Sequence, residues 1–342
     1  MSVLIPARNE ALYIRSVLEG LARQTYPAEL LEVLVIDDHS TDGTAEVACK
    51  FIEQRGLHHF RVLSHRADGI QPTYKKAAIT FGLQYARGEL ILATDADCRV
   101  QPDWVASMVR HYGPRTGLVA GLITFEKRLE KGLFQKLQTL EFAGLVFAGV
   151  GAAGIGKPLI CNGANLSYRR KAFDEVGGFR GHDHLPSGDD DLLMQNIHRK
   201  TDWEVRFNLD PASIVYTRPV KTLGQFYNQR ARWASKGVHY PGMSTFLLLL
   251  AIYLFYLLLL GAGAGWLAGW VSGRWLAAGL ALKVLPELLV VSQALAVLGR
   301  RDLLIYLPLA ELAHIPYIVL MGFAGFFKLF RWKPEPTPER QP

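Results

Sequence analysis

Asp95 and Asp97, separated by a single residue, could together bind a metal ion. They end an apolar run that begins at Leu90 and has the composition of a buried strand. Side chains at positions i and i+2 of an extended segment share a face, which places the two carboxylates roughly 6–7 Å apart. Such a pair can hold a divalent cation, Mg²⁺ or Mn²⁺, and leave coordination positions for the oxygens of a diphosphate. The competing interpretation is an Asx turn that caps the following helix.

Three consecutive acids, Asp189, Asp190 and Asp191, form a second group that could carry chemistry. Repulsion between adjacent carboxylates, together with partial burial, would raise the pKa of at least one of them. A carboxylate tuned in this way suits a general base that takes a proton from an attacking hydroxyl. The acids could equally form the first turn of a helix, where the helix dipole favours negative charge.

Asp37, Asp38 and Lys75 stand at the boundaries of expected elements. The two aspartates follow an apolar strand, so they could accept hydrogen bonds from a nucleobase or from ribose hydroxyls. They could also cap the next helix, which is a common use of aspartate. Lys75 precedes a helix, where it could pair with a phosphate or simply be solvated.

Gln229, Arg232 and Trp233 belong to the sequence Q-R-A-R-W on a basic helix expected at 222–239. At this spacing an amide, a guanidinium and a flat ring can face one cleft. The same pattern also fits a juxtamembrane helix with a tryptophan at the membrane interface.

The elements that would position these residues alternate between strand and helix. We expect strands at 2–6, 31–36, 61–63, 90–93 and 118–125, and helices at 10–23, 41–52, 72–85 and 103–112. This alternation predicts a Rossmann-like α/β domain with a mostly parallel central sheet, flanking helices and right-handed crossovers. In such sheets ligands bind beyond the carboxyl ends of the strands, where the acidic residues fall. The apolar segment 133–150 is either a core helix or a helix along a membrane surface.

Charge and cysteine content narrow the classes of protein. The net charge of +7 comes without a zinc pattern, an RNP signature or an arginine-rich arm, which argues against nucleic acid and favours anionic lipid headgroups. The three cysteines are widely spaced and odd in number, which argues against a disulfide framework. We therefore expect a reducing, cytosolic location for the main domain, with no signal peptide before it.

The predicted organisation is a main domain at 1–240, a membrane domain at 241–330 and a disordered tail at 331–342. Three hydrophobic segments of the membrane domain could span a bilayer, at about 244–271, 275–298 and 303–327. The middle segment carries Lys283 and Glu287, a pair that is unfavourable in lipid unless it faces protein or lies at the interface. Positive charge after the last segment favours an even number of crossings, with the middle segment at the interface.

Taken in order, these stretches resemble the family 2 glycosyltransferases, which are inverting enzymes of the GT-A fold that use nucleotide-activated sugars. The resemblance covers roughly residues 2–240. The family includes the membrane synthases of cellulose, hyaluronan and poly-N-acetylglucosamine, which the chain also resembles. It rests on V-L-I-P-A-R-N-E, V-I-D-D-H-S-T-D-G-T, the Lys75 helix, T-D-A-D-C, N-G-A-N-L-S-Y-R-R, G-D-D-D-L and Q-R-A-R-W, in that order.

The resemblance implies a role for each matching residue. The donor site would comprise Pro6, Ala7, Asn9, Glu10, Asp37, Asp38, Lys75, Asp95, Asp97, Gln229, Arg232 and Trp233. Within this set Asp38 would bind the nucleoside, and Asp95 and Asp97 would bind the metal and the diphosphate. The catalytic base would be Asp190, the second member of a pair with Asp189. The third acid of the stretch permits a register one residue away.

The implied reaction is transfer of a sugar, with inversion, from a nucleotide sugar to a hydroxyl of a lipid or glycan acceptor. UDP is the expected nucleotide, and a divalent cation, Mg²⁺ or Mn²⁺, is the expected cofactor. The enzyme would lie in the cell membrane with several crossings, a cytosolic catalytic domain and other membrane subunits as candidate partners. Transfer to a polyprenyl phosphate is one alternative, and a catalytically silent membrane subunit is another. The intact acids and Q-R-A-R-W argue against both.

Overall fold

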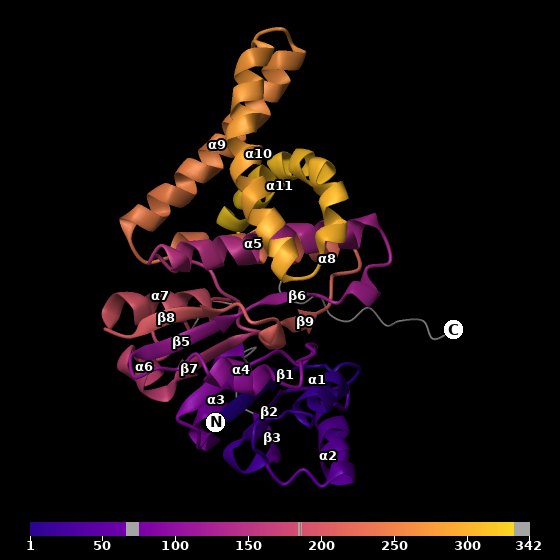
Figure 1. The fold of residues 1–342 in the computed structure, drawn as a ribbon, viewed down its shortest axis with the longest axis vertical. Coiled ribbons are helices and arrows are strands. Elements are labelled where there is room, and N and C mark those ends of the chain that lie inside the picture. Colours follow the sequence, from indigo (N-terminus) through magenta and orange to yellow (C-terminus); the bar gives the residue numbers. More distant parts are fainter. Residues whose placement is uncertain (66–74, 184, 186, 332–342) are drawn as a thin grey trace.

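The structure, a computed structural model, describes residues 1–65, 75–183, 185 and 187–331. The start of the expected helix at 72–74 and the expected tail from residue 332 onward lie outside the described residues. An α/β body carries the N-terminal two thirds of the chain, and apolar helices extend from one side of it (Figure 1).

A seven-stranded sheet forms the centre of the body, in the order β3-β2-β1-β4-β7-β5-β8. Its strands are β1 (Ser2–Ala7), β2 (Glu32–Asp38), β3 (Phe60–His65), β4 (Leu90–Ala93), β5 (Thr116–Gly121), β7 (Leu166–Arg169) and β8 (Glu204–Asn208). Strand β7 is antiparallel to both neighbours and the other pairs are parallel, which confirms a mostly parallel sheet.

The strand expected at 118–125 is divided between two sheets. Its second half, β6 (Ile123–Phe125), pairs in parallel with β9 (Val215–Thr217). The chain leaves the large sheet at Leu122, whose carbonyl accepts a hydrogen bond from Asn165 Nδ2 at 2.7 Å. A pattern of apolar residues cannot reveal this change of partner, because both halves remain buried.

Helices cover both faces of the sheet because its central strands are apolar on both sides. Val3 and Ile5 of β1 pack in one core with α1 (Ile14–Leu21) and α2 (Thr44–Arg55). Leu4 points to the other face and packs with α3 (Lys75–Tyr85). Further elements of the body are α4 (Trp104–Val109), α5 (Leu133–Gly154), α6 (Arg170–Glu175), α7 (Asp191–Lys200), α8 (Leu223–Ala234), η1 (Ala28–Leu30), η2 (Lys127–Leu129), η3 (Pro211–Ser213) and η4 (Gly237–His239).

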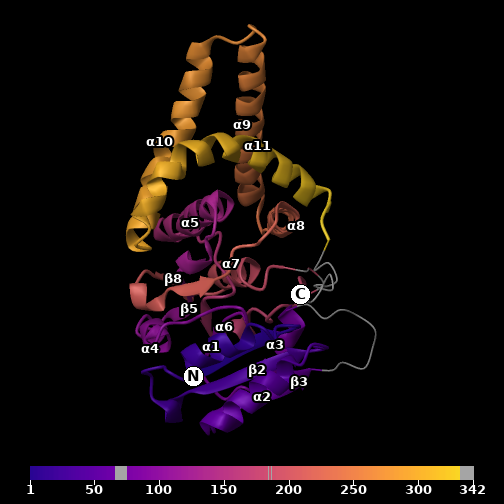
Figure 2. The ribbon, with the colours of Figure 1, turned by 90° about the vertical axis from the view of Figure 1, so that its right-hand side faces the viewer.

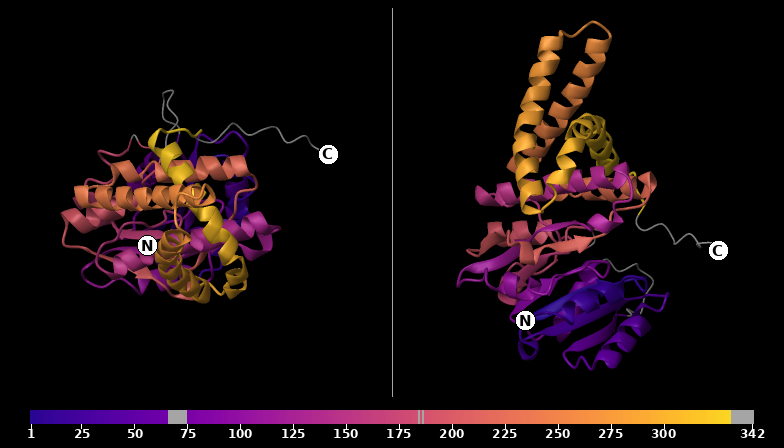
Figure 3. Two further views of the ribbon diagram at one scale, coloured as in Figure 1. Left: turned by 90° about the horizontal axis from the view of Figure 1, so that it is seen from above. Right: turned by 45° about the vertical axis from the view of Figure 1, so that its right-hand side comes forward.

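The C-terminal helices form a hairpin and an arch. Helices α9 (Met243–Leu267) and α10 (Gly273–Val297) lie antiparallel and stand away from the sheet (Figures 1 and 3). After η5 (Arg301–Tyr306), helix α11 (Leu307–Phe326) runs across the base of this hairpin, above α5 and α8 (Figure 2). Helices α5, α9, α10 and η5–α11 are long and apolar enough to cross a membrane by length and composition.

The middle hydrophobic segment is the one for which an interfacial location is expected. It forms α10, the partner of α9, and α11 is the helix that lies crosswise (Figure 2). The polar pair within it faces protein, because Lys283 Nζ lies 2.9 Å from Glu287 Oε2 and also contacts Glu311 of α11. The contact with a residue 28 positions away removes the need for an interfacial location.

Candidate active site

The loop after β1 is held against the segment that follows β2. Asn9 has a left-handed backbone with a φ of 55°, and its Oδ1 accepts a hydrogen bond from the Thr41 N–H at 2.8 Å. The Glu10 N–H donates to Thr44 Oγ1 at 2.8 Å. A large cavity begins here, and its lining includes Pro6, Ala7 and Glu10. In the described structure Asn9 does not line the cavity. Its hydrogen bond to Thr41 instead fixes the shape of the loop.

Asp37 and Asp38 end β2 but have different surroundings. Asp38 lines the cavity, and its Oδ1 lies 2.9 Å from His39 Nδ1 and 3.0 Å from His65 Nδ1. Asp37 is buried, and its Oδ1 has no hydrogen-bond partner within the described part of the chain. The two histidines orient the Asp38 carboxylate. Sequence reasoning missed both, and only the adjacency of His39 to Asp38 could have indicated one of them.

Asp95 and Asp97 lie just beyond β4 and within reach of one cation. One ligand atom from each of these residues and the Cys98 Sγ all lie within 4.8 Å of one another. Burial and the neighbouring Asp95 raise the pKa of Asp97 to about 6, so a cation beside it would relieve an unfavourable charge. Two carboxylates suit a hard divalent cation such as Mg²⁺ or Mn²⁺. The Cys98 thiol is a softer ligand, and burial raises its pKa.

Lys75 connects these aspartates with the acidic stretch. Its Nζ lies 2.6 Å from Asp95 Oδ1 and 3.0 Å from Asp189 Oδ2, and it donates to the Gly163 carbonyl at 3.2 Å. Burial alone would lower the pKa of Lys75, but Asp189 and Asp95 outweigh burial and raise that pKa. Lys75 therefore stays protonated and can exchange a carboxylate partner for a phosphate oxygen.

The Asp191 carboxylate is held by hydrogen bonds and an ion pair within the protein. It is fully buried, and its carboxylate accepts hydrogen bonds from the Cys161 N–H at 2.9 Å and the Tyr240 hydroxyl at 2.7 Å. The Lys236 Nζ lies 2.6 Å from Asp191 Oδ2 and 3.3 Å from Asp190 Oδ1. Burial, with a contribution from Asp190, raises the pKa of Asp191 to about 6. With these partners Asp191 is poorly placed to meet a substrate.

Asp190 and Asp189 precede Asp191 and differ from each other. Asp190 is the N-cap of α7: it accepts the Asp191 N–H at 2.7 Å, and it also accepts the Gly163 N–H at 3.1 Å. The side chains of Asp189 and Asp190 are about equally buried, with 12% and 13% exposed, but Asp189 pairs with Lys75. Burial would raise the pKa of Asp189, but Lys75 outweighs burial and lowers it, so Asp189 is ionised at neutral pH. Both residues line the cavity.

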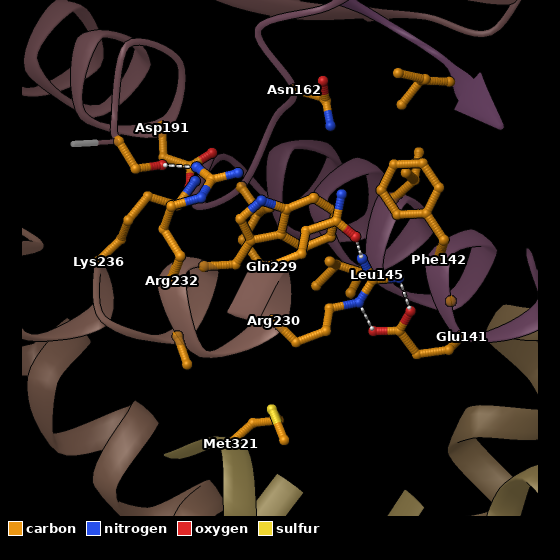
Figure 4. A pocket seen from close by; sticks show the side chains of 18 of the residues that line it. Glu141, Phe142, Leu145, Asn162, Asp191, Gln229, Arg230, Arg232, Lys236 and Met321 are labelled. Atoms are coloured by element: carbon orange, nitrogen blue, oxygen red, sulfur yellow. Dashed lines mark hydrogen bonds and ion pairs between the residues drawn. The ribbon is translucent and has the colours of Figure 1, made fainter. Parts of the chain in front are cut away.

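Gln229, Arg232 and Trp233 line the same cavity from α8. Gln229 and Arg232 are labelled in Figure 4. The Arg232 Nη1 lies 3.3 Å from Ser187 Oγ, in the segment that leads to the acids. Arg230 lies between Gln229 and Arg232 in the sequence. It is buried, and its Nη1 donates a hydrogen bond to Gln229 Oε1 at 2.6 Å. Its guanidinium lies 4.3 Å from the centre of the Trp233 ring. Arg230 therefore holds two of the three residues in position.

Arg230 is itself fixed by α5. Its Nε and Nη2 donate to the two carboxylate oxygens of Glu141 at 3.2 Å and 2.6 Å (Figure 4). The Tyr317 hydroxyl of α11 donates to the same carboxylate at 2.9 Å. Sequence reasoning missed Glu141, Lys236 and Tyr240 as well as Arg230. Lys236 alone carried a signal, since it lies four residues after Arg232 on one face of the basic segment.

One cavity of about 1460 Å³ is lined by Asp38, Lys75, the D-x-D pair, the acids at 189–191 and side chains of the Q-R-A-R-W segment. It begins at Pro6 and Asp38, passes the acids and the Q-R-A-R-W segment, and reaches Tyr256 and His314 of the C-terminal helices. The site therefore combines a pair of aspartates within reach of one cation, the ionised Asp189, and the lysines Lys75 and Lys236. It also connects these groups to an apolar surface.

Comparison with known proteins assigns the chain to a family. The model of "Glycosyl transferase family 2" matches residues 2–177, and that of "Glycosyl transferase family group 2" matches residues 90–327. The chain therefore belongs to the family 2 glycosyltransferases, which confirms the resemblance stated above.

Among similar proteins, the glycosyltransferase AglE of Haloferax volcanii is 30% identical over 243 residues, covering 68% of this chain and 71% of AglE. The poly-β-1,6-N-acetyl-D-glucosamine synthase of Staphylococcus epidermidis is 23% identical over 245 residues, covering 69% of this chain and 54% of the synthase. The chain thus matches only about half the length of that synthase and of the probable glycosyltransferase YdaM of Bacillus subtilis.

A solved structure supports the fold. The mannosyltransferase PcManGT from Pyrobaculum calidifontis, in complex with GDP-mannose and Mn²⁺, superposes with a TM-score of 0.60. The likeness covers 96% of this chain and 87% of that protein at 20% sequence identity. At this identity the likeness concerns the fold alone, and it agrees with the expected GT-A architecture followed by apolar helices.

Proposed function

We propose that the protein is an inverting glycosyltransferase that moves a sugar from a nucleotide diphosphate sugar to a hydroxyl of a membrane-associated lipid or glycan. The observation that carries this proposal is the single cavity that joins Asp38, the D-x-D pair, Asp189 and the Q-R-A-R-W segment. Each group matches one part of such a reaction, and all of them line one continuous space.

The donor half of the cavity suits a nucleoside diphosphate. Asp38, oriented by two histidines, would accept hydrogen bonds from the nucleoside. Asp95 and Asp97 would hold a divalent cation, which when bound offsets the charge that develops on the leaving diphosphate. Lys75 and Arg232 would contact the same phosphates. We propose UDP as the nucleotide. GDP sugars should be tested as well, because PcManGT was solved in complex with GDP-mannose.

Asp189 is the base that the geometry favours. All three acids line the cavity, but Asp190 and Asp191 accept backbone N–H groups and share Lys236, whereas Asp189 pairs with Lys75. A diphosphate at the D-x-D pair would compete for Lys75, and Asp189 would become more basic as that contact weakens. A single displacement then inverts the anomeric centre and requires no covalent nucleophile. The assignment of the base to Asp190 stays a prediction that the variants below distinguish.

The membrane arrangement belongs to the same proposal. We take α9 and α10 as two crossings of the cell membrane, with the α/β body on the cytosolic face. Both helices expose long apolar surfaces, as lipid contact requires. Other membrane subunits could bind beside the hairpin.

A panel of nucleotide sugars tests the function. Purified full-length protein in detergent is incubated with UDP and GDP sugars, with Mn²⁺ or Mg²⁺, and with or without a membrane lipid extract. We expect one sugar to be released from its nucleotide in a metal-dependent way and to appear on an acceptor, which mass spectrometry identifies. Complete inactivity with every donor, in protein that binds none of them, would refute the proposal.

A further inference from the structure

The cavity continues beyond the acids, between the body and the C-terminal helices. Past Trp233 its walls are apolar side chains from α5, α9, α10 and α11, among them Leu145, Leu249, Val290 and Ile318. Its volume of about 1460 Å³ exceeds the roughly 300–1,000 Å³ of ordinary small-molecule pockets. A nucleotide sugar at one end therefore leaves space for an extended apolar chain at the other.

The apolar end of the cavity reaches the outer surface of the helices. Phe246 of α9 and Phe323 and Phe326 of α11 line the cavity and are also exposed, by 41%, 51% and 61%. Exposed apolar surface of this extent marks contact with a membrane or an apolar ligand. The cavity is therefore continuous with the surface that would face the lipid chains of a bilayer.

A polar cluster stands within this apolar end. The Tyr256 hydroxyl donates to Glu287 Oε1 at 2.6 Å, and His314 Nδ1 lies 3.4 Å from Glu287 Oε2. Lys283 contacts both Glu287 and Glu311, so its charge is already matched by carboxylates. The cluster can hydrogen-bond to a neutral polar group but has little positive charge to offer an anion.

We propose that this end of the cavity binds the acceptor, and that the acceptor is a membrane lipid with an uncharged hydroxyl. The inference rests on the proposed function and names the substrate class for it. The hydroxyl lies beside Asp189, and the apolar part lies between α5 and the C-terminal helices. Lys75 and Lys236 also line the end with the acids at 189–191, but each is already shared between two carboxylates, and Glu287 and Glu311 line the other end. These two lysines therefore offer a phosphate head group little uncommitted positive charge.

The transfer balances without a further reactant. The acceptor oxygen forms a bond to the anomeric carbon as the bond from that carbon to the diphosphate oxygen breaks. The bonding electron pair leaves with the nucleoside diphosphate, and the hydroxyl proton passes to Asp189. A hydroxyl needs this base because it is protonated at neutral pH, whereas a lipid phosphate would not.

Three soluble or micellar probes test the acceptor class. The full chain, in mixed micelles with its identified donor, receives 1-dodecanol, dodecyl phosphate or a water-soluble oligosaccharide, and release of the nucleotide is followed in parallel. We expect glycosylated dodecanol. Product on the phosphate or the oligosaccharide but not on the alcohol overturns the inference and leaves the proposed function standing. Donor cleavage with no product on the alcohol overturns it too. No donor cleavage under any condition refutes the proposed function itself.

Variants that narrow the apolar end test its location. Val290→Trp on α10 and Ala313→Trp on α11 place a large ring in the cavity lining. Leu289→Trp and Leu312→Trp are matched controls on adjacent outward positions, which are 65% and 67% exposed. We expect the first pair to lower transfer to dodecanol by about tenfold relative to donor hydrolysis, and the controls to change that ratio by less than about twofold. An equal response of all four variants, each eluting as a monodisperse species, would overturn the assignment.

Discussion

At the scale of single residues, three chemically identical side chains differ because their surroundings differ. The Asp191 carboxylate accepts hydrogen bonds from the Tyr240 hydroxyl and the Cys161 backbone N–H, and Asp190 is the N-cap of α7. Asp189 alone of the three pairs with Lys75 in the described structure and faces the same space as Asp95. The chain turns into a helix at this point, so consecutive carboxylates point in different directions. Residue type and position in the sequence are therefore insufficient to choose the base.

Replacing Asp189 by Asn tests that choice. The change removes the proposed proton acceptor and keeps the size of the side chain, so transfer should fall by about 10²–10⁴-fold. Affinity for the nucleoside diphosphate, measured by calorimetry, should change little. Asp190→Asn is the matched control: Asn is also a good N-cap, so this variant should stay folded and lose less activity. The reverse order of the two activities would return the base to Asp190.

Removal of divalent cations tests Asp95 and Asp97. Treatment with EDTA should abolish transfer and weaken nucleotide binding, because the negative charges of the diphosphate and the carboxylates would then be uncompensated. Added Mn²⁺ or Mg²⁺ should restore both. In calorimetric titrations Asp97→Asn should lose the metal-dependent part of the nucleotide affinity, whereas Cys98→Ala in the same turn should keep it. Equal losses in the two variants would contradict a site made of carboxylates.

At the scale of elements, the position of α8 depends on a buried ion pair with α5. Arg230 and Glu141 expose only 2% and 16% of their side chains. Glu141→Gln would leave the Arg230 charge buried without a counter-charge, which costs roughly 3–5 kcal/mol and should lower the unfolding temperature by about ten degrees. The exposed pair Arg15–Glu19 provides the control, since Glu19→Gln should have almost no effect.

A second variant separates charge from packing at this contact. Replacing both partners, as Arg230→Met with Glu141→Leu, should recover most of the stability lost in Glu141→Gln, because no buried charge remains. Transfer should stay impaired, since Gln229 loses its hydrogen-bond donor and Trp233 loses the guanidinium above it. Thermal unfolding and the transfer assay, made on the same preparations, provide the two readouts. Full activity in the double variant would contradict a positioning role for Arg230.

Five of the seven strands of the large sheet could be predicted, because their signals are local, whereas β7 and β8 were not among the expected strands. Apolar runs such as 31–36 end in polar residues, and this pattern alone indicates buried parallel strands with a site at their carboxyl ends. The contacts that complete the site could not be predicted. Glu141 is 89 residues from Arg230, and Lys236 meets Asp190 across 46 positions, so these partners depend on tertiary packing. For the same reason, the crosswise course of α11 could not be predicted from its composition.

At the scale of the whole molecule, α11 is attached to the body at both of its ends. Before α11, the Arg300 Nη1 lies 2.6 Å from Oε1 of Glu130, which follows η2. After it, the Tyr227 hydroxyl of α8 donates to the Leu329 carbonyl at 2.8 Å. A helix that begins and ends against the same domain returns to the side from which it started. Composition alone makes α11 a candidate span, and its two attachments argue that it lies along the membrane surface.

The two crossings proposed for α9 and α10 would place the hairpin tip opposite the body and the end of α11. Trp266, Trp270 and Trp275 surround the tip, as expected at a membrane interface, and Lys328 and Arg331 stay on the side of the body. A membrane-impermeant maleimide on intact cells should label Ser272→Cys but not Arg331→Cys, each in a Cys49→Ser background. Arg331→Cys should react only after permeabilisation, as should exposed Cys49 of the unmodified chain. Labelling of Arg331→Cys in intact cells would mean that α11 crosses the bilayer, and the cavity would then open toward the opposite leaflet.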